Sequence, residues 1–377
     1  DSLARYPPTK RGAVTMYRPF RAVLFAGLVA LAAAGSTHGG DQAAPQWGIA
    51  QPVPNDGRLS VMTYNIKGLP WPIVSDRRAA LTAIADRLAR LRQSGRQPHV
   101  ILLQEAFTPE AAQIAARAGY RHVAQGPDVA HRSTAAAQGA DQSHLAQARW
   151  DRGEAIGKQL SSGLQILSDY PITRIDRMAF PDFACAGFDC LANKGVLIAH
   201  ISVPGFERPV SIVNTHLNAR KAAGVAIDRS QRAFARQVDL VTQFVAAHVP
   251  AGQPMILGGD MNIGQDRLRA HIFFTRFAQA EMRFIAPELD GARRALAQSA
   301  WANDAIRRDL TSTRARAKDW LFARDAGDRP LKVVAAHVPF GSEPDSQPLS
   351  DHFGYVIDYS LRSGVDLARS DRAGAAS

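Results

Sequence analysis

Short apolar segments alternate along the chain with longer amphipathic ones. Eight short segments have the length and the β-branched or alternating composition of strands. These segments are residues 59–65, 99–104, 163–167, 195–201, 209–215, 254–257, 320–322 and 354–359. Strands interleaved with helices predict an α/β fold in layers with a buried sheet.

Two longer segments have the 3.6-residue period of a helix. The first is expected over residues 76–93, with Ser75 as its N-cap, and the second over 227–248. Residues 124–158 are rich in Ala, Gln and polar side chains and predict a long insertion or a mobile loop. Residues 361–377 resemble a disordered tail, and no linker divides residues 58–360, so we expect one catalytic domain.

The N-terminal segment has the pattern of a secretory signal peptide. Two arginines precede an apolar run from residue 22 to 35, and Ala32, Ala33 and Ala34 form an A-x-A-like site. Cleavage near Ala34, within an upstream segment of residues 1–37, would make the protein secreted or periplasmic. An uncleaved anchor is the alternative, although the run is shorter than the roughly 20 residues of a spanning helix.

Composition limits the partners without choosing among them. The 377 residues are 46 % hydrophobic and 21 % charged, with a net charge of +11 and a pI near 10.1. Removing the expected signal peptide leaves about +7, which favours anionic partners such as nucleic acid, phospholipid headgroups or phosphate esters. Cys185 and Cys190 are expected to form a local disulfide, since two cysteines alone make a weak zinc site.

Polar residues recur where predicted strands end or begin. The stretches are MTYNIKG with Asn65, ILLQEAF with Glu105, SIVNTHLNA with His216, MILGGDMNI with Asp260 and Asn262, KDWLF with Asp319, and PLSDHFGYVIDY with Asp351 and His352. A single such residue is readily explained as a cap or turn. Six such sites favour a shared function.

Phosphodiester hydrolysis explains these residue types. Mg²⁺ prefers one or two carboxylates together with substrate phosphate and water, and Glu105 with Asn65 as a neutral ligand fits such a site. The metal would act as a Lewis acid, and a histidine would transfer protons near neutral pH.

The stretch GGDMNI predicts a particular geometry. In an extended strand, Asp260 and Asn262 share a face, so one could orient a water while the other donates to a phosphate oxygen. The two glycines before them would let the backbone approach a ligand closely. Asp351 and His352 are expected to converge in a turn.

Six motifs in this order, TYNIKG, LLQEAF, NTHLNA, GGDMNI, KDW and LSDHF, make the chain resemble the endonuclease/exonuclease/phosphatase superfamily over about residues 58–360. The resemblance implies a DNase I-like four-layer α/β sandwich of two packed mixed sheets flanked by helices. It also implies roles for the marked residues. Glu105 would be the main metal ligand with Asn65 and Asp351 nearby, Asp260 would orient the water, Asn262 and His216 would bind phosphate, Asp319 would support His216, and His352 would be the acid/base residue.

Within that superfamily the chain is most similar to the neutral sphingomyelinase branch. SSGLQILSDYPI and DCLANKGVLIAHI carry its pattern, with Asp189 and Lys194 before a strand, where the lysine would contact the lipid phosphate. Lys67 replaces the acidic residue of some nucleases, which removes a second metal ligand. KDWLFAR lacks the tryptophan-rich motif of inositol polyphosphate phosphatases.

The leading hypothesis is a secreted, Mg²⁺-dependent phosphodiesterase that splits sphingomyelin or a related phospholipid into a phosphorylated headgroup and a lipid alcohol. Mn²⁺, Co²⁺ or Ca²⁺ are alternative metals. A secreted nuclease and a non-catalytic module that binds lipid or protein are the alternative functions. HIFFTRF, residues 271–277, is either a membrane-contacting loop or a helix that packs Phe273 and Phe277 inward. The sequence leaves the oligomeric state open.

Overall fold

The computed structural model describes residues 57–70, 73–298, 303–327, 329–343 and 347–360. The expected signal peptide and C-terminal tail lie outside these residues. The strands of the described residues are β1 (Arg58–Gly68), β2 (Val100–Ala106), β3 (His122–Gln125), β4 (Gln165–Ser168), β5 (Ile172–Ala179), β6 (Gly195–Ile201), β7 (Val210–His216), β8 (Met255–Asp260), β9 (Asp319–Arg324), β10 (Val333–Phe340) and β11 (Gly354–Ser360). All eight predicted strands are present, whereas β3, β5 and β10 were not predicted.

The described strands form two mixed sheets. The six-stranded sheet has the order β10-β11-β1-β2-β4-β3, and the five-stranded sheet has the order β5-β6-β7-β8-β9. Only the pairs β1–β2 and β7–β8 are parallel among the described strands. The helices are α1 (Arg77–Gln93), α2 (Pro109–Ala112), α3 (Ile114–Arg117), α4 (Ala140–Ala146), α5 (Ile227–His248), α6 (Arg267–Gln279), α7 (Gly291–Ala297) and α8 (Asp304–Arg316).

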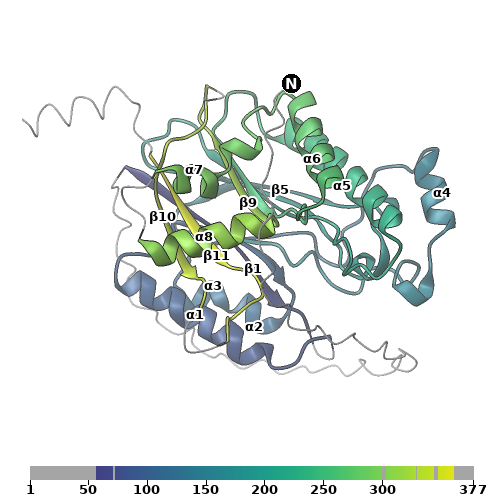
Figure 1. Cartoon of the computed structure of the whole chain (residues 1–377), viewed down its shortest axis with the longest axis horizontal. Coiled ribbons are helices and arrows are strands. Elements are labelled where there is room, and N and C mark those ends of the chain that lie inside the picture. The colour runs from purple at the N-terminus through teal and green to yellow at the C-terminus, as the bar shows by residue number, and fades with distance from the viewer. Residues whose placement is uncertain (1–56, 71–72, 299–302, 328, 344–346, 361–377) are drawn as a thin grey trace, which may run out of the picture. The chain divides into compact units, whose positions relative to one another are not determined.

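Three hydrophobic clusters show how these elements are layered. One cluster fills the space between the sheets, a second joins the five-stranded sheet to α5 and α6, and a third joins the six-stranded sheet to α1 and α3. Helices α1–α3 and helices α5 and α6 therefore lie on opposite sides of the paired sheets (Figure 1). This is the predicted four-layer α/β sandwich, and it is confirmed.

The period-two pattern of β1 explains why this strand is buried on both faces. Leu59 and Val61 belong to the core between the sheets, while Met62, Tyr64 and Ile66 pack beneath the helices. A strand in the middle of a layered sheet needs apolar residues on both faces, which is why its sequence shows a nearly continuous apolar run. The next residues on the inner face are Thr63, which is buried, and Asn65, which begins the polar edge described below.

The two predicted helices are confirmed with small corrections. Helix α1 begins at Arg77, and its N-cap is Asp76, which has a left-handed backbone with φ of 58° and makes no side-chain capping bond. The expectation that Ser75 caps this helix is therefore wrong. In α6, Phe273 and Phe277 are buried, so the prediction that HIFFTRF packs inward is confirmed for these two side chains.

The segment 124–158 is more structured than its composition suggested. It contains α4 and a short 3₁₀ turn (Trp150–Arg152), and Glu154 ties it to the body of the protein. The Glu154 carboxylate accepts hydrogen bonds from Arg229 at 2.6 Å and from the backbone N–H of Gly187 at 2.8 Å. The prediction of a mobile loop is wrong for this anchored part, because a buried ion pair that sequence spacing does not show fixes it.

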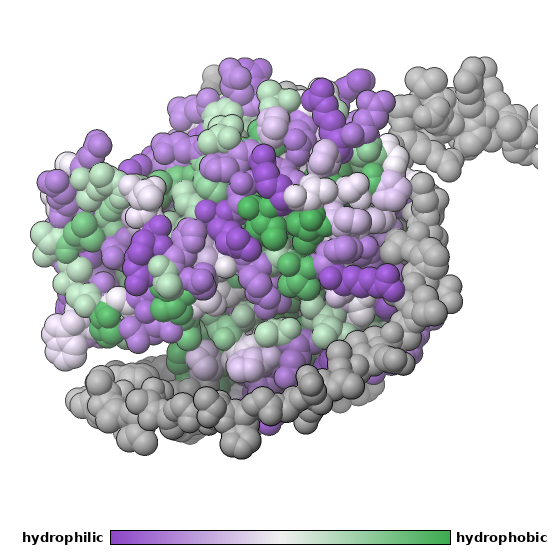
Figure 2. Space-filling view, turned by 180° about the vertical axis from the view of Figure 1, so that it is seen from behind, coloured by the Kyte–Doolittle hydropathy of each residue, from purple (hydrophilic) through white to green (hydrophobic). Residues whose placement is uncertain are grey.

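The surface carries no broad apolar area on the face drawn in Figure 2, where hydrophobic and hydrophilic residues are interspersed. Five of the large hydrophobic side chains that the described residues expose lie near the insertion or the loop after it: Val129, Leu145, Trp150, Ile156 and Phe188. Every helix among the described residues is too short or too polar to cross a lipid bilayer.

Asn214 on β7 forms a polar bridge to β2 and β4 of the other sheet, and its substitution tests how much this bridge stabilises the fold. Its amide donates to the carbonyls of Leu103 at 2.8 Å and Gln165 at 3.0 Å and accepts from Gln104 at 2.8 Å. Asn214→Ala leaves these buried groups unpaired, so we expect urea unfolding to show a loss of about 3 kcal/mol. Gln93→Ala, an exposed change on α1, is the control and should stay within about 0.5 kcal/mol of wild type. An unchanged urea midpoint for Asn214→Ala would contradict a stabilising bridge.

Candidate active site

The register of the five-stranded sheet places three predicted residues in one row. His216 on β7 lies opposite Asp260 on β8, which lies opposite Asp319 on β9. Ile212 and Ile256, four residues before the first two, face the core between the sheets. Because side chains alternate along a strand, His216 and Asp260 project from that same face. The site is therefore the polar end of the intersheet core.

The six-stranded sheet contributes Asn65 and Glu105 from the ends of its parallel strands. The pairing of β1 with β2 shifts after Asn65, and Glu105 has a left-handed backbone with φ of 57°. Regular alternation would turn Glu105 toward the helices, as it does Leu103, and the change of backbone breaks that alternation. The Asn65 amide then donates to Glu105 Oε1 at 2.9 Å and to Asp260 Oδ2 at 3.1 Å. One asparagine thus joins the carboxylates of the two sheets.

Gly68 makes this irregular strand end feasible. A Cβ atom at Gly68 would lie 2.5 Å from the carbonyl oxygen of Glu105, far inside van der Waals contact. A left-handed non-glycine residue costs about 1–3 kcal/mol and usually persists where function requires it. Lys67, Glu105 and Asn262 all have this conformation, with φ of 50°, 57° and 47°. Backbone strain is therefore concentrated at this edge of the sheets.

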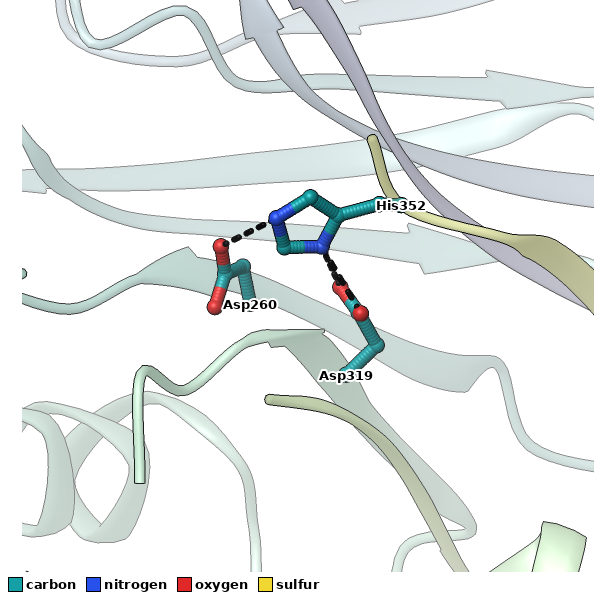
Figure 3. A group of neighbouring side chains, drawn as sticks. All are labelled: Asp260, Asp319 and His352. Atoms are coloured by element: carbon teal, nitrogen blue, oxygen red, sulfur yellow. Dashed lines mark hydrogen bonds and ion pairs between the residues drawn. The ribbon is translucent and has the colours of Figure 1, made fainter. Parts of the chain in front are cut away.

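His352 lies between two aspartates (Figure 3). Its Nδ1 is 2.8 and 2.9 Å from the two oxygens of Asp319, and its Nε2 is 3.7 Å from Asp260 Oδ2. Burial lowers the pKa of His352, but the charges of Asp319 and Asp260 outweigh it and raise this pKa to about 9. His352 is therefore an imidazolium at neutral pH. The expectation that Asp319 supports His216 is wrong, since Asp319 orients His352.

The pKa of Asp260 shifts downward, whereas the pKa of His352 shifts upward. Burial raises its pKa, but His352, His216 and Lys318 together with the backbone N–H of Asn262 outweigh that effect and lower it to about 2. Asp260 thus remains a carboxylate across the physiological range. Its Oδ1 accepts the Asn262 N–H at 3.0 Å.

Asn262 does not extend β8 as the sequence suggested. The strand ends at Asp260, and the left-handed backbone of Asn262 turns the chain so that its side chain donates to the carbonyl of Leu217 at 2.9 Å. The prediction that Asp260 and Asn262 share a strand face is therefore wrong. Both still lie at the site, brought together by a turn in which the Asp260 side chain accepts the Asn262 backbone N–H.

The two glycines before Asp260 serve the packing of the sheet rather than approach to a ligand. A Cβ atom at Gly259, whose φ is 134°, would lie 2.0 Å from the carbonyl oxygen of Thr215 on β7. A Cβ atom at Gly258 would lie 2.5 Å from Leu321 on β9 and 3.2 Å from Leu102 in the other sheet. The expected role at the ligand is thus wrong, since the neighbouring strands occupy that space.

Lys194 and Asp189 meet at the site as a buried pair. Lys194 Nζ is 2.9 Å from Asp189 Oδ2, 3.2 Å from His216 Nε2 and 3.3 Å from the carbonyl of Leu217. An ammonium can only donate, so His216 Nε2 accepts and the ring proton lies on Nδ1. Burial and the Lys194 charge lower the pKa of His216 to about 3, so this histidine is neutral.

A disulfide closes the loop that carries Asp189. Cys185 and Cys190 are bonded to each other, which confirms the predicted pairing. Asp189 Oδ2 also accepts the backbone N–H of Ala219 at 2.5 Å. The covalent loop therefore fixes the carboxylate that positions Lys194.

Asp351 and His352 diverge rather than converge. The side chain of Asp351 is 59 % exposed and lies 3.4 Å from Lys67 Nζ, while His352 is buried. Burial raises the pKa of Asp351, but His352 and Lys67 outweigh it, and the net shift is downward. The Ser350 hydroxyl lies 3.5 Å from an Asp351 carboxylate oxygen and also donates to the carbonyl of Asn65, so the metal-ligand role of Asp351 near Asn65 stays a prediction.

Ser350 and Lys318 are two residues that the sequence analysis did not assign. The Ser350 hydroxyl donates to the carbonyl of Asn65 at 2.7 Å and accepts the His352 N–H at 3.3 Å, so it joins the His352 loop to β1. The Lys318 charge acts on Asp260 and His352. Both residues lie inside recognised motifs, PLSDHF and KDW, which was the available signal.

Glu105 with Asn65 fits a hard divalent cation better than the other clustered acids do. Asp260, Asp319 and His352 lie close enough together to contact one ion, but a protonated imidazole offers no lone pair to a metal. Burial raises the pKa of Glu105, which the hydrogen bond from Asn65 and the Lys194 charge only partly oppose. A nearby cation would stabilise this carboxylate in its charged form.

The four-layer sandwich, with its Asp–His–Asp chain and its Glu/Asn edge at the ends of the strands, has the DNase I-like fold. The chain belongs to the Endonuclease/Exonuclease/phosphatase family, whose model matches residues 62–373.

Curated relatives include sphingomyelinases of Mycobacterium bovis and Mycobacterium tuberculosis. Each is 25 % identical to this chain over 234 residues, which is 60 % of this chain and 39 % of the relative. The chain therefore spans well under half the length of the relatives it matches.

Solved structures with the same fold include a sphingomyelinase and a beta toxin. Sphingomyelinase C from Streptomyces griseocarneus superposes with a TM-score of 0.52 at 19 % identity, over 80 % of this chain and 99 % of that one. A mutant of beta toxin from Staphylococcus aureus with bound magnesium ions gives 0.52 at 16 % identity, over 80 % and 99 %. At these identities the likeness shows the fold alone.

The charge on His352 is open to direct measurement. In metal-free buffer with EDTA, NMR titration should give His352 a pKa near 9, and Asp319→Asn should lower it by at least about one unit. This pKa lies above the unfolded value of about 6.5, so the stabilisation is complete below that pH and is lost as pH rises through about 9. Asp228→Asn, an exposed change on α5, should leave the titration unchanged. A wild-type value near 6.5 would exclude the Asp–His–Asp charge chain.

Proposed function

We propose that the protein is an exported, Mg²⁺-dependent phosphodiesterase of the sphingomyelinase C type, which releases a phosphorylated headgroup from sphingomyelin or a related phospholipid. The observation that carries the proposal is the Asp189–Lys194 pair. These are the residues by which the chain resembles sphingomyelinases, and Lys194 reaches His216 at 3.2 Å inside the site. The mycobacterial sphingomyelinase relatives support the same substrate class.

Glu105 and Asn65 would hold the metal, with Asp351 as a further ligand once it leaves Lys67. Mg²⁺ would supply Lewis-acid stabilisation of the leaving oxygen. Magnesium is preferred over Mn²⁺, Co²⁺ or Ca²⁺ because the ligands are oxygen atoms and beta toxin of the same fold binds magnesium.

Asp260 and His352 would carry the proton transfers. Asp260 is too weak a base to retain a proton at neutral pH, so it orients the water by accepting its hydrogen bond. Water attack forms a new P–O bond while the ester P–O bond to the lipid alcohol breaks. The leaving oxygen takes its proton from His352 Nε2, which Asp319 keeps correctly oriented. The proton that the attacking water loses passes by way of Asp260 Oδ2, 3.7 Å from that nitrogen, and replaces the one that His352 gave up.

Lys194, His216 and Asn262 would bind the phosphate. Lys194 contributes a positive charge, and neutral His216 and the Asn262 amide contribute N–H donors. His216 Nδ1 is buried and has no hydrogen-bond partner among the described residues, which leaves a donor for a bound group. Asp189 limits the movement of Lys194, so the charge is positioned before substrate arrives.

Export follows from the expected signal peptide, residues 1–37, which lies outside the described residues. Contact with a membrane surface would then be peripheral. The net charge of about +7 that remains after removal of the signal peptide would aid association with an anionic surface, and it equally favours the second candidate, a secreted nuclease.

Substrate choice separates the two candidates. Phosphocholine release from sphingomyelin micelles should occur with Mg²⁺ and stop with EDTA, while plasmid DNA in the same buffer should remain intact. The two assays share metal and pH, so they differ only in the group attached to the phosphate. A nicked plasmid beside untouched lipid would make the protein a nuclease with the same catalytic centre.

Glu105→Gln tests the metal ligand. It removes the carboxylate charge with little change of volume, so we expect turnover to fall about 100-fold or more, with an unchanged thermal unfolding temperature. Glu110→Gln, a carboxylate on the neighbouring α2 paired with Arg78, is the matched control and should retain activity. Full activity of Glu105→Gln would remove Glu105 from the centre.

A further inference from the structure

A separate pocket of about 480 Å³ lies beside Asn262. Two loops, residues 219–222 and 262–266, form its walls, and Lys318 completes it next to the catalytic Asp319. The pocket therefore adjoins the centre that acts on the phosphodiester, and of its lining residues Asn262 alone has a role in the proposed reaction.

A fully buried arginine holds the two walls in place. Arg269 donates to the carbonyl of Asn218 at 2.7 Å and to that of Asn262 at 2.8 Å, one on each wall, and it also reaches the carbonyl of Ala219 at 3.4 Å. Its guanidinium is 0 % exposed, and its Nε bonds Gln231 at 2.7 Å. The pocket is thus fixed by bonds between its walls and does not depend on a ligand to form.

Arg269 also orients backbone donors. In a trans peptide the N–H points opposite to the C=O, so the N–H groups of Arg220 and Ile263 point away from Arg269. Both residues line the pocket, and neither N–H has an acceptor among the hydrogen bonds of the described residues. One N–H group on each wall can therefore donate to an anion in the pocket, as backbone N–H groups do in other anion-binding loops.

The side chains of the pocket are cationic. Arg220 forms an ion pair with Asp266 at 2.6 Å, which accounts for the only acidic side chain in the lining. Lys221 and Lys318 form no ion pair within the part of the chain that the structure describes, so two positive charges remain. The Lys318 charge already acts on Asp260 and His352, which places it close to the reacting group.

The lining is unsuited to a quaternary ammonium. Such a cation is recognised by the faces of aromatic rings, and no aromatic residue lines this pocket. Lysines and free backbone N–H groups instead match the oxygen atoms of a phosphate.

We propose that this pocket is a subsite for a second anionic group of the substrate, a phosphate that the released headgroup carries in addition to the scissile one. The inference rests on the proposed phospholipid hydrolysis and narrows it. Headgroups with a second phosphate are the preferred substrates, and zwitterionic phosphocholine is a poorer one because its cation meets Lys221 and Lys318.

A matched pair of lipids tests the subsite. Phosphatidylglycerol phosphate and phosphatidylglycerol differ only by a terminal phosphate, and each is presented at the same mole fraction in neutral detergent micelles with Mg²⁺. Wild type should cleave the first with a kcat/KM about tenfold higher, the scale of one charge-assisted hydrogen bond. In Lys221→Met/Lys318→Met this ratio should fall toward one. Lys332→Met, an exposed lysine elsewhere, should keep the wild-type ratio.

Binding of inorganic pyrophosphate provides a readout that does not need turnover. Titration calorimetry in EDTA should show binding to wild type that weakens about tenfold in the double variant and not in Lys332→Met. Equal kcat/KM for the two lipids in wild type, or a ratio and a pyrophosphate affinity that survive the double substitution, would overturn the subsite.

The same assays distinguish a wrong phospholipid assignment from a wrong anion subsite. If wild type releases no headgroup from any lipid but still binds pyrophosphate through Lys221 and Lys318, the phospholipid assignment falls and the anion site stands. If the double variant instead loses cleavage of plasmid DNA, the second anion is a neighbouring nucleic-acid phosphate, and the headgroup assignment is overturned.

Discussion

The structure depends on one buried carboxylate, Asp260, where the two sheets meet. It accepts a hydrogen bond from Asn65 of one sheet and faces His352, whose other nitrogen is held by Asp319. Buried charges are tolerated only when they are paired and hydrogen-bonded, and removing one partner from such a group costs several kcal/mol. The sheets must therefore stay in register at this end, and the close packing around the glycines of β8 follows from that requirement. The left-handed backbones at Glu105 and Asn262 follow as well, because regular strands would direct these side chains elsewhere.

Much of this arrangement is written in the period of two along the strands. Val61 and Ile256 face the intersheet core, and Asn65 and Asp260 stand four residues later on the same face. When each inner face is followed to its polar end, the sequence alone gives Asn65, His216, Asp260 and Asp319. Thr63 and Asn214 are polar residues that lie two positions earlier on β1 and β7. The missed strands had no such signal. β5, ITRIDRMA, is an edge strand with mostly polar or partly exposed residues, and its pattern does not separate it from a loop.

The sequence could not show which side chains pair with each other. Asp319 lies in register with Asp260, and His216 and His352 both lie nearby, so only the positions of the loops decide which histidine it orients. The same holds for Asp351. Its sequence position does not show that it pairs with Lys67 while the adjacent His352 pairs with Asp319. Long-range ion pairs such as Glu154–Arg229, separated by 75 residues, likewise fix a segment whose composition indicates a loop.

The order of the strands places two lysines on different sides of Asp260, and their surroundings differ. Asp260 is on β8, an inner strand of its sheet. Lys194 precedes β6, which lies on one side of β8, and Lys318 precedes the edge strand β9 on the other side. A phosphodiester bound at Asp260 thus has a positive charge on each flank, but the two charges are supported differently. Lys194 is buried, paired with Asp189 and in contact with His216, so it belongs to the reacting phosphate. Lys318 instead lines a pocket together with Lys221, so in the proposed function it would contact a group that the substrate carries beyond that phosphate. The strand ends would then hold the reacting groups, and the loops beyond β7 and β8 would select the headgroup.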